Sequence, residues 1–320
     1  MTTPIARCTA DHLVDQAVCQ AATNAFGDVV WLGAGPSVKV LTSQLAPVVG
    51  FELGTSGAHV TSLAVAGETV AVVSATTLEL YALVGRSIAE LDLPESSGFA
   101  RAAFTADGRT LVWCGSDHEG RVLNVQIIDA TTGEVTASIS LPCAEPIESC
   151  TVFPAGDRGV LVAGWEPDGE HCNVVARVDA DTGTLTALDG AAGFSVIGAS
   201  PTGEVALIVP HGSDELFRLD LASGGVRPWL TPIEPADEDH HVALDENSGA
   251  VFLDERLVVV SSEYEDPVLL DLRADDGSPR RLRLESVAAG PSFVCRLGRR
   301  AFLTAEAARD GARLRVWEVG

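Results

Sequence analysis

The chain has 320 residues, of which 45 are acidic and 21 basic, and its formal net charge at pH 7 is −24. That charge excludes nucleic acid as an expected partner, because phosphate backbones are bound by basic surfaces. Hydrophobic residues make up 46% of the chain, but no apolar run approaches the roughly 20 residues that span a bilayer. The start of the chain also lacks the apolar stretch of a secretory signal. We therefore expect a cytoplasmic protein that does not engage a membrane.

The seven cysteines are odd in number and show no Cys-x-x-Cys spacing. In the cytoplasm they are expected to be reduced and mostly buried as small hydrophobic side chains. Cys143, Cys150, His171 and Cys172 are the set considered for zinc, but their spacing resembles no structural zinc site.

A module of about forty residues recurs seven times along the chain. Each copy has a first short strand that ends in a tight turn, at Gly27, Gly67, Gly108, Gly156, Gly203, Glu255 and Gly298. A second hydrophobic strand and a loop follow, and then a third strand that ends near Leu41, Tyr81, Ile128, Val178, Leu219, Leu270 and Trp317. Such a period is typical of β-propellers. The repeat predicts one all-β domain over residues 1–320, a seven-bladed propeller of four-stranded antiparallel blades.

In chain order, modules one and two cover about residues 17–53 and 58–93 and have weaker turn signals than the rest. Module three, about 99–142, has the clearest strands: Phe99–Phe104, Thr110–Cys114, Val122–Ile128 and Val135–Leu141. Asp107 and Gly108 supply the backbone conformations that its first turn needs. The same order of strands and turns recurs in modules four, five and six, about 147–189, 194–231 and 250–285.

Module seven, about 291–319, offers only three strands: Phe293–Leu297, Ala301–Thr304 and Arg313–Val319. A strand around Pro4–Thr9, near the N-terminus, is available as the fourth strand, and residues 4–10 are therefore assigned to this blade. Pairing it with the last sheet would close the ring and remove an exposed edge. We expect this closure.

The segment Asp310–Val319 ends in Val-Trp-Glu-Val and resembles the end of a WD40 repeat. Phe104–Arg109 is similar to the Phe-Ser-Pro-Asp-Gly turn of that family, and an acid follows the third strand at Asp129, Asp179, Asp220 and Asp271. The paired Gly-His of the family is absent, so the resemblance, to divergent WD-repeat or YVTN-like propellers, covers architecture rather than the family's internal hydrogen-bond network. It implies an interaction platform, by analogy of fold.

The repeat also predicts which loops share a face. Loops between second and third strands, and connections between blades, should open on one rim. The loops between second and third strands contain His118, His171 and His211. The connections between blades are assigned the remaining histidines, His12, His59, His240 and His241. Several arginines fall in turns of the opposite rim, so the molecule is expected to be electrostatically two-sided.

Acidic residues follow the histidines onto the same rim. The insert 232–249 is the longest connection and holds six acids beside the histidine pair. A long polar loop is also the ordinary form of a surface excursion, so the insert alone does not establish a site. The residues assigned to partner binding are Glu166, Asp168, Asp237, Glu238, Asp239, His240, His241, Glu263, Glu265 and Asp266.

Two functions fit this pattern. The first is a non-catalytic, monomeric scaffold without a cofactor, which docks a basic protein or peptide on the acidic rim by charge complementarity. The second is a lyase or hydrolase that uses a divalent metal or an acid–base pair on the same rim. Its candidate residues are His118, His171, His211, Asp117, Glu170 and Asp214, which lie in corresponding loops of three consecutive modules. No pair of them has the spacing of a known catalytic motif. A sensor that binds a small molecule in the central channel is a third possibility, but no particular residue supports it.

Overall fold

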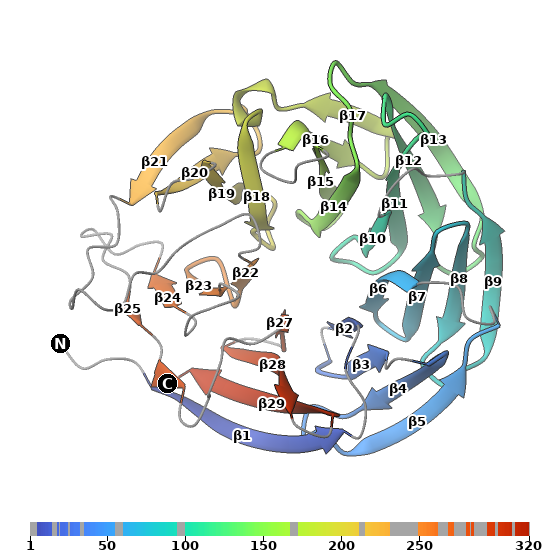
Figure 1. Ribbon diagram of the computed structural model, residues 1–320, viewed down its shortest axis with the longest axis vertical. Coiled ribbons are helices and arrows are strands. Elements are labelled where there is room, and N and C mark those ends of the chain that lie inside the picture. The colour runs from blue at the N-terminus through green and yellow to red at the C-terminus, as the bar shows by residue number, and fades with distance from the viewer. Residues whose placement is uncertain are drawn as a thin grey trace.

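The computed structural model describes residues 5–14, 18, 20–24, 26–32, 35–54, 60–94, 100–166, 172–210, 215–230, 249–261, 268–271, 280–281, 283–284, 293–297, 300–308 and 311–319. Within these ranges the strands form seven sheets arranged as blades around a central axis (Figure 1). The predicted seven-bladed propeller of four-stranded antiparallel blades is confirmed. The one described helix is a short 3-10 turn, η1 (Asp189–Ala191), and no described helix is long and apolar enough to cross a membrane.

Each of the first six blades is a meander of four strands that follow one another in the chain. Blade one holds β2 (Gln20–Thr23), β3 (Val29–Leu32), β4 (Ser37–Leu41) and β5 (Pro47–Glu52). Blade two holds β6 (Val60–Ala66), β7 (Thr69–Ser74), β8 (Thr77–Ala82) and β9 (Ser87–Asp92). Blade three holds β10 (Arg101–Phe104), β11 (Thr110–Ser116), β12 (Val122–Asp129) and β13 (Val135–Pro142).

The next three blades repeat the arrangement. Blade four holds β14 (Ser149–Pro154), β15 (Gly159–Trp165), β16 (Cys172–Asp179) and β17 (Thr184–Ala187). Blade five holds β18 (Phe194–Ala199), β19 (Val205–Pro210), β20 (Leu216–Asp220) and β21 (Val226–Leu230). Blade six holds β22 (Gly249–Phe252), β23 (Leu257–Ser261), β24 (Val268–Asp271) and β25 (Arg280–Arg281).

The last blade joins the two ends of the described chain. It holds β27 (Phe293–Arg296), β28 (Ala301–Ala308), β29 (Gly311–Val319) and, as its fourth strand, β1 (Ile5–Val14). The register of β1 against β29 runs from Ala6 opposite Val319 to Val14 opposite Ala312. A short strand from the chain that leaves blade six, β26 (Arg283–Leu284), pairs in parallel with the start of β1. The predicted N-terminal closure is therefore confirmed.

The closing strand is longer than the sequence suggested. β1 continues past Thr9 to Val14, so His12 lies within a strand opposite Leu314. The assignment of His12 to a connection between blades was wrong. The outer face of this strand is largely polar and exposed, which hides its extent from a pattern based on hydrophobic residues.

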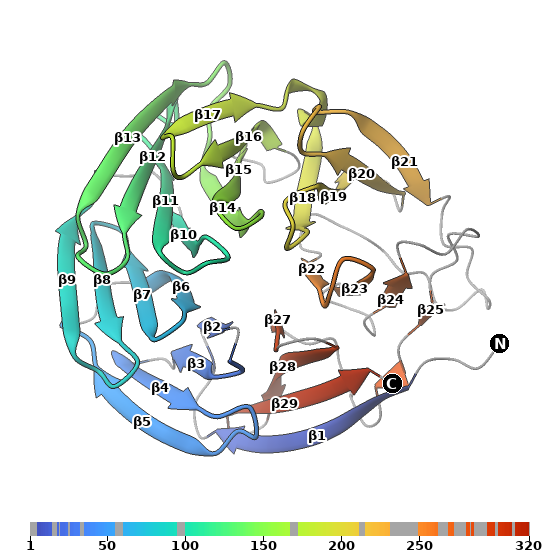
Figure 2. The same cartoon turned by 180° about the vertical axis from the view of Figure 1, so that it is seen from behind.

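Burial is greatest in the second strand of each blade and least in the outermost strand. The first strands lie near the axis and the fourth strands at the circumference (Figures 1 and 2). All seven residues of β15 are buried, whereas the outer strand β13 alternates between exposed and half-buried positions. Because second strands are covered on both faces by neighbouring blades, they form continuous apolar runs.

The core of the described molecule consists of seven hydrophobic clusters, and each one lies between two neighbouring blades. Between blades three and four, for example, Val112 and Ile127 pack with Val160 and Val162. The cluster between the last blade and blade one contains Leu314, Val14 and Trp31. Each blade needs a neighbour on either side to cover its two faces. Closing the ring therefore completes the core.

Candidate functional site

The rim predicted to carry function is described best over blades three and four. There the turn 117–121, between β11 and β12, lies against the connection 143–148 between the blades. The Ile147 N–H donates to the Gly120 carbonyl at 2.8 Å, and the Cys143 N–H donates to the Arg121 carbonyl at 2.8 Å. These two hydrogen bonds hold the turn and the connection together as one fixed surface.

Gly120 is required at this contact. Its φ is +69°, and a Cβ there would lie 2.6 Å from the Ile147 carbonyl oxygen. Any side chain would push the turn away from the connection. The close approach places the turn and the connection side by side on the rim.

Asp117 holds the turn together. Its Oδ1 accepts hydrogen bonds from the backbone N–H groups of Arg121 at 2.6 Å and Val122 at 3.0 Å. This is the geometry by which an aspartate stabilises a tight turn. The carboxylate predicted as a candidate acid–base group is thus engaged by the backbone, while His118 beside it is exposed.

Exposed carboxylates surround this fixed surface. Glu119 projects from the turn, and Glu145 and Glu148 project from the connection. The nearby Arg121 donates from Nη1 to the Ala144 carbonyl at 2.8 Å. Glu166 follows β15 on the same rim and is half-buried. We call Glu119, Glu145, Glu148 and Glu166 the acidic rim.

Most of the predicted site residues lie outside the described ranges, so their convergence is still a prediction. Of the partner-binding set only Glu166 is described, and of the catalytic set only Asp117 and His118. The others, outside those ranges, are Asp168, Glu170, His171, His211, Asp214, Asp237, Glu238, Asp239, His240, His241, Glu263, Glu265 and Asp266.

The cysteines considered for zinc lie in or beside the core. Cys150 and Cys172 are buried, Cys143 is half-buried, and the structure holds all three as free thiols. Burial raises the pKa of the Cys172 thiol to about 12, which favours the protonated form rather than the thiolate that binds metals. No group of three or more potential metal ligands occurs among the described residues, and His171 is not one of them.

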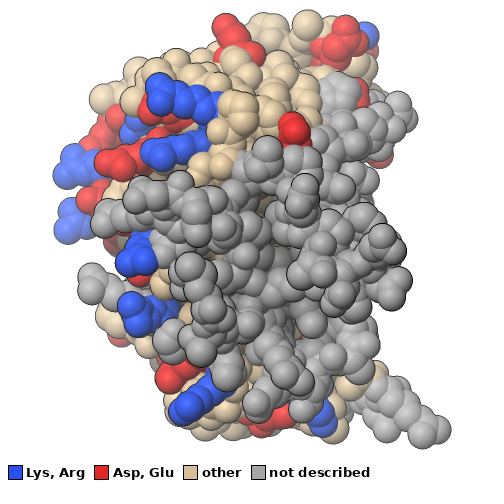
Figure 3. All heavy atoms as spheres, turned by 90° about the vertical axis from the view of Figure 1, so that its left-hand side faces the viewer, with Lys and Arg blue, Asp and Glu red and all other residues tan. Residues whose placement is uncertain are grey.

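The opposite rim is mixed in charge rather than basic. Arg109, Arg158 and Arg256 lie there, but Asp157 lies beside Arg158, and the guanidinium of Arg158 forms an ion pair with Asp181. Blue and red side chains are also intermixed on the left of the view in Figure 3. The expected division into an acidic and a basic face does not hold over the described residues.

Aspartates anchor the turns of that rim. Asp129 Oδ1 accepts hydrogen bonds from the backbone N–H groups of Thr131 at 2.8 Å and Thr132 at 2.9 Å. The Thr131 hydroxyl also donates to it, and these bonds lower the pKa of Asp129. Asp179 and Asp220 make the same contacts in the next two blades. These three acids after third strands therefore stabilise the turns that follow them.

No protein-family model matches the chain, and no curated protein matches it either. Solved structures do match over nearly its whole length. The WD40 domain of Pan2 from Neurospora crassa aligns with a TM-score of 0.68 at 13% identity, covering 99% of this chain and 96% of that one. The β-propeller domain of Cps50 (Swd1) from Myceliophteria thermophila gives 0.65 at 11% identity, covering 98% and 100%. This protein has the WD40 propeller fold.

BamB from Moraxella catarrhalis, at 13% identity, covers 98% of this chain and 100% of its own with a lower TM-score of 0.56. Identities this low establish the fold alone, and function has to be argued from the residues of the site.

A hydrogen-bond network that begins at Trp317 in the WD40-like propeller was not expected. Trp317 Nε1 donates to Thr304 Oγ1 at 2.9 Å, and Thr304 donates to Glu306 Oε1 at 3.2 Å. Glu306 Oε2 lies 3.1 Å from Arg315 Nη1. The network is confined to the last blade, where the Trp motif was recognised.

A cavity on the circumference of the WD40-like propeller was also missed. It lies between β1 and blade one and includes His12, Trp31 and Lys39 in its lining. The one signal in the sequence was Lys39, the only lysine of the chain, set between Val38 and Val40. Finding the cavity needed the position of β1.

Proposed function

We propose that this propeller is a non-catalytic scaffold that docks a cationic protein or peptide on its acidic rim. The observation that carries the proposal is the surface at blades three and four, where Glu119, Glu145 and Glu148 are exposed on a turn and a connection fixed by hydrogen bonds. Carboxylates held on a rigid frame need little ordering when a partner binds, so less of the interaction free energy is lost.

The charge of the whole chain supports the same conclusion. A net charge of −24 attracts basic partners over a distance and raises their association rate, an effect that salt weakens. Propellers with the fold of the Pan2 and Swd1 domains commonly act as interaction platforms. We propose that the docking face extends to Asp168, to the 237–241 segment and to the acids at 263–266, and that the protein acts as a cytoplasmic monomer.

The test compares two variants with the same change in net charge. E119Q/E145Q/E148Q neutralises part of the acidic rim, and E68Q/E134Q/D157N neutralises three exposed acids of the opposite rim. Proteins captured from native lysate by the wild type, identified by mass spectrometry, should be lost by the first variant and kept by the second. They should also elute as NaCl rises to about 0.5 M, where screening acts over a few ångströms. Equal capture by both variants would reject the acidic rim as the docking face.

A further inference from the structure

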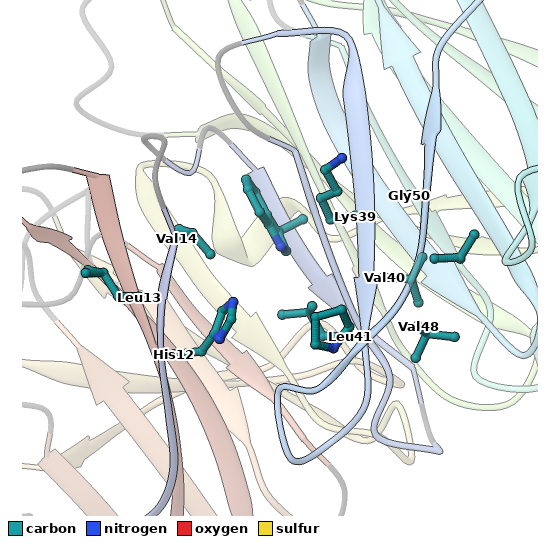
Figure 4. Close-up of a pocket in the computed structure, with 11 residues that line it drawn as sticks. His12, Leu13, Val14, Lys39, Val40, Leu41, Val48 and Gly50 are labelled. Carbon is teal, nitrogen blue, oxygen red and sulfur yellow. The ribbon is translucent and has the colours of Figure 1, made fainter.

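The cavity at the ring closure has a volume of about 600 Å³, within the range of small-molecule sites. His12 and Val14 of β1 face Lys39 and Leu41 of β4 across it, with Val48 at its edge (Figure 4). It is thus formed by the first blade together with the strand that closes the last one.

The polar side chains of this cavity carry only nitrogen. Lys39 supplies an ammonium group, His12 an imidazole and Trp31 an indole N–H, and no aspartate or glutamate is among the lining residues. The chain has 45 acidic residues and a single lysine, and that lysine is one of the residues that line this cavity. No hydrogen bond or ion pair of Lys39 occurs within the described part of the chain.

Trp31 adds an unsatisfied donor. Its side chain lies in the cluster with Val14 and Leu41, and the residue is 5% exposed. Its Nε1–H nevertheless has no acceptor among the residues that the structure describes. A buried donor without a partner is unfavourable, so an acceptor brought by a ligand would remove that cost.

The backbone positions the donors on one face. Trp31 pairs directly with Lys39 across β3 and β4, and Lys39 pairs with Gly50 across β4 and β5. A Cβ at Gly50 would lie 2.9 Å from Lys39 Cδ, so glycine leaves room for the lysine stem to lie over β5. Directly opposed residues point to the same side of a sheet.

The rest of the cavity is apolar. Leu41 and Val14 are buried in its wall, whereas Val48 at its edge is 58% exposed. A ligand that fits would cover Val48 and place an acceptor group at the donors. Burial of apolar area contributes roughly 25 cal/mol per Å² to binding, before the cost of association.

We propose that this cavity binds a small amphipathic carboxylate, with its carboxylate at Lys39 and Trp31 and its hydrocarbon against Leu41, Val14 and Val48. An anion complements the ammonium group by charge and offers the acceptor that the indole lacks. A cationic amphiphile would be repelled by Lys39, and a neutral alcohol would make only the weaker bonds. The site is separate from the acidic rim, so it does not depend on the proposed scaffold function.

The experiment uses three straight-chain probes with the same total number of carbon atoms: octanoate, octanol and octylamine. Binding is followed by NMR of the indole N–H groups of the ¹⁵N-labelled protein, which has five tryptophans. W31F assigns the Trp31 signal, and the four remaining signals report that this variant is folded. Trp113 serves as an internal control, because its Nε1 also lacks an acceptor within the described ranges but the residue is fully buried.

Octanoate should shift the Trp31 signal and leave the Trp113 signal in place, while octanol binds more weakly and octylamine does not bind. K39M keeps the aliphatic stem and should weaken octanoate on the order of tenfold. R227M, which removes one exposed charge from the outer strand of blade five, should not change affinity. The proposal is overturned if the Trp31 signal does not respond to octanoate, or if octanoate binds K39M as tightly as the wild type.

Discussion

Arg315 and Asp11 join the two ends of the described chain, with Arg315 Nε 3.3 Å from Asp11 Oδ2 although the residues are 304 positions apart. The Arg315 side chain is 7% exposed and also lies 3.1 Å from Glu306. The ion pair therefore connects β1 to β29 at a place where the guanidinium is largely removed from water. It marks the ring closure as a fixed contact of the fold.

Loss of β1 should destabilise the whole ring. Deleting residues 1–14 would expose the β29 edge and remove Ala6 and Val14 from two hydrophobic clusters. We expect the midpoint of thermal unfolding to fall by about 10 °C or more. Deletion of residues 1–4, which precede β1, is the control and should have a much smaller effect. Equal midpoints for the two deletions in a calorimetric scan would mean that β1 does not hold the ring closed.

The contribution of the Trp317 hydrogen bond to the free energy of unfolding should be measurable by comparison with Trp113. Trp317 and Trp113 are both fully buried, but only Trp317 donates from Nε1, to Thr304. Trp→Phe leaves a cavity in either case. W317F also leaves Thr304 without its donor, so it should cost about 1 kcal/mol more than W113F in the free energy of unfolding. Urea denaturation of both variants measures this difference, and a larger cost for W113F would contradict it.

The repeating strands could be predicted because turn residues mark their ends. Thr110–Cys114 and Val122–Ile128 were expected, and β11 and β12 extend them by two residues and one residue at their C-terminal ends. Gly108 has a φ of +71°, as the Asp-Gly turn required. Local backbone preferences and apolar runs agree here, so the blades can be read from the sequence.

The site was less predictable because its residues come from several blades. Asp117 was grouped with the acids of the rim, but its backbone hydrogen bonds depend on a loop conformation that composition does not specify. The cavity at Lys39 depends on β1, whose partner lies some 300 positions away in the sequence. Pairing between distant segments leaves no local periodic signal.

Tyr81 should make stability fall at high pH. Burial, together with the hydrogen bond that its hydroxyl donates to Glu79, raises the pKa of Tyr81 to about 12. The unfolded chain releases this proton near pH 10 and the folded chain does not. The contribution of Tyr81 to the free energy of unfolding is therefore fully present below about pH 10. It falls by about 2 kcal/mol as the pH rises toward 12. Y81F should lack this part of the loss, measured by urea denaturation at pH 9 and pH 11.

Phenolate absorbance gives an independent control for Tyr81. The chain has two tyrosines, so the wild type minus Y81F isolates the titration of this residue. A midpoint near pH 10 in that difference would contradict the raised pKa and the buried contact with Glu79.

Thiol reactivity should separate Cys8 from Cys172. Cys8 is exposed on β1, and its pKa is raised by partial burial and by the Asp11 carboxylate, while burial raises the pKa of Cys172 to about 12. Because the thiolate is the nucleophile, iodoacetamide at pH 8 should label Cys8 slowly and leave Cys172 unlabelled until denaturant is added. D11N removes the nearby negative charge and should accelerate labelling of Cys8 alone, as measured by peptide mass spectrometry. Rapid labelling of Cys172 in the native protein would show that the packing between blades four and five opens far more often than a closed ring allows.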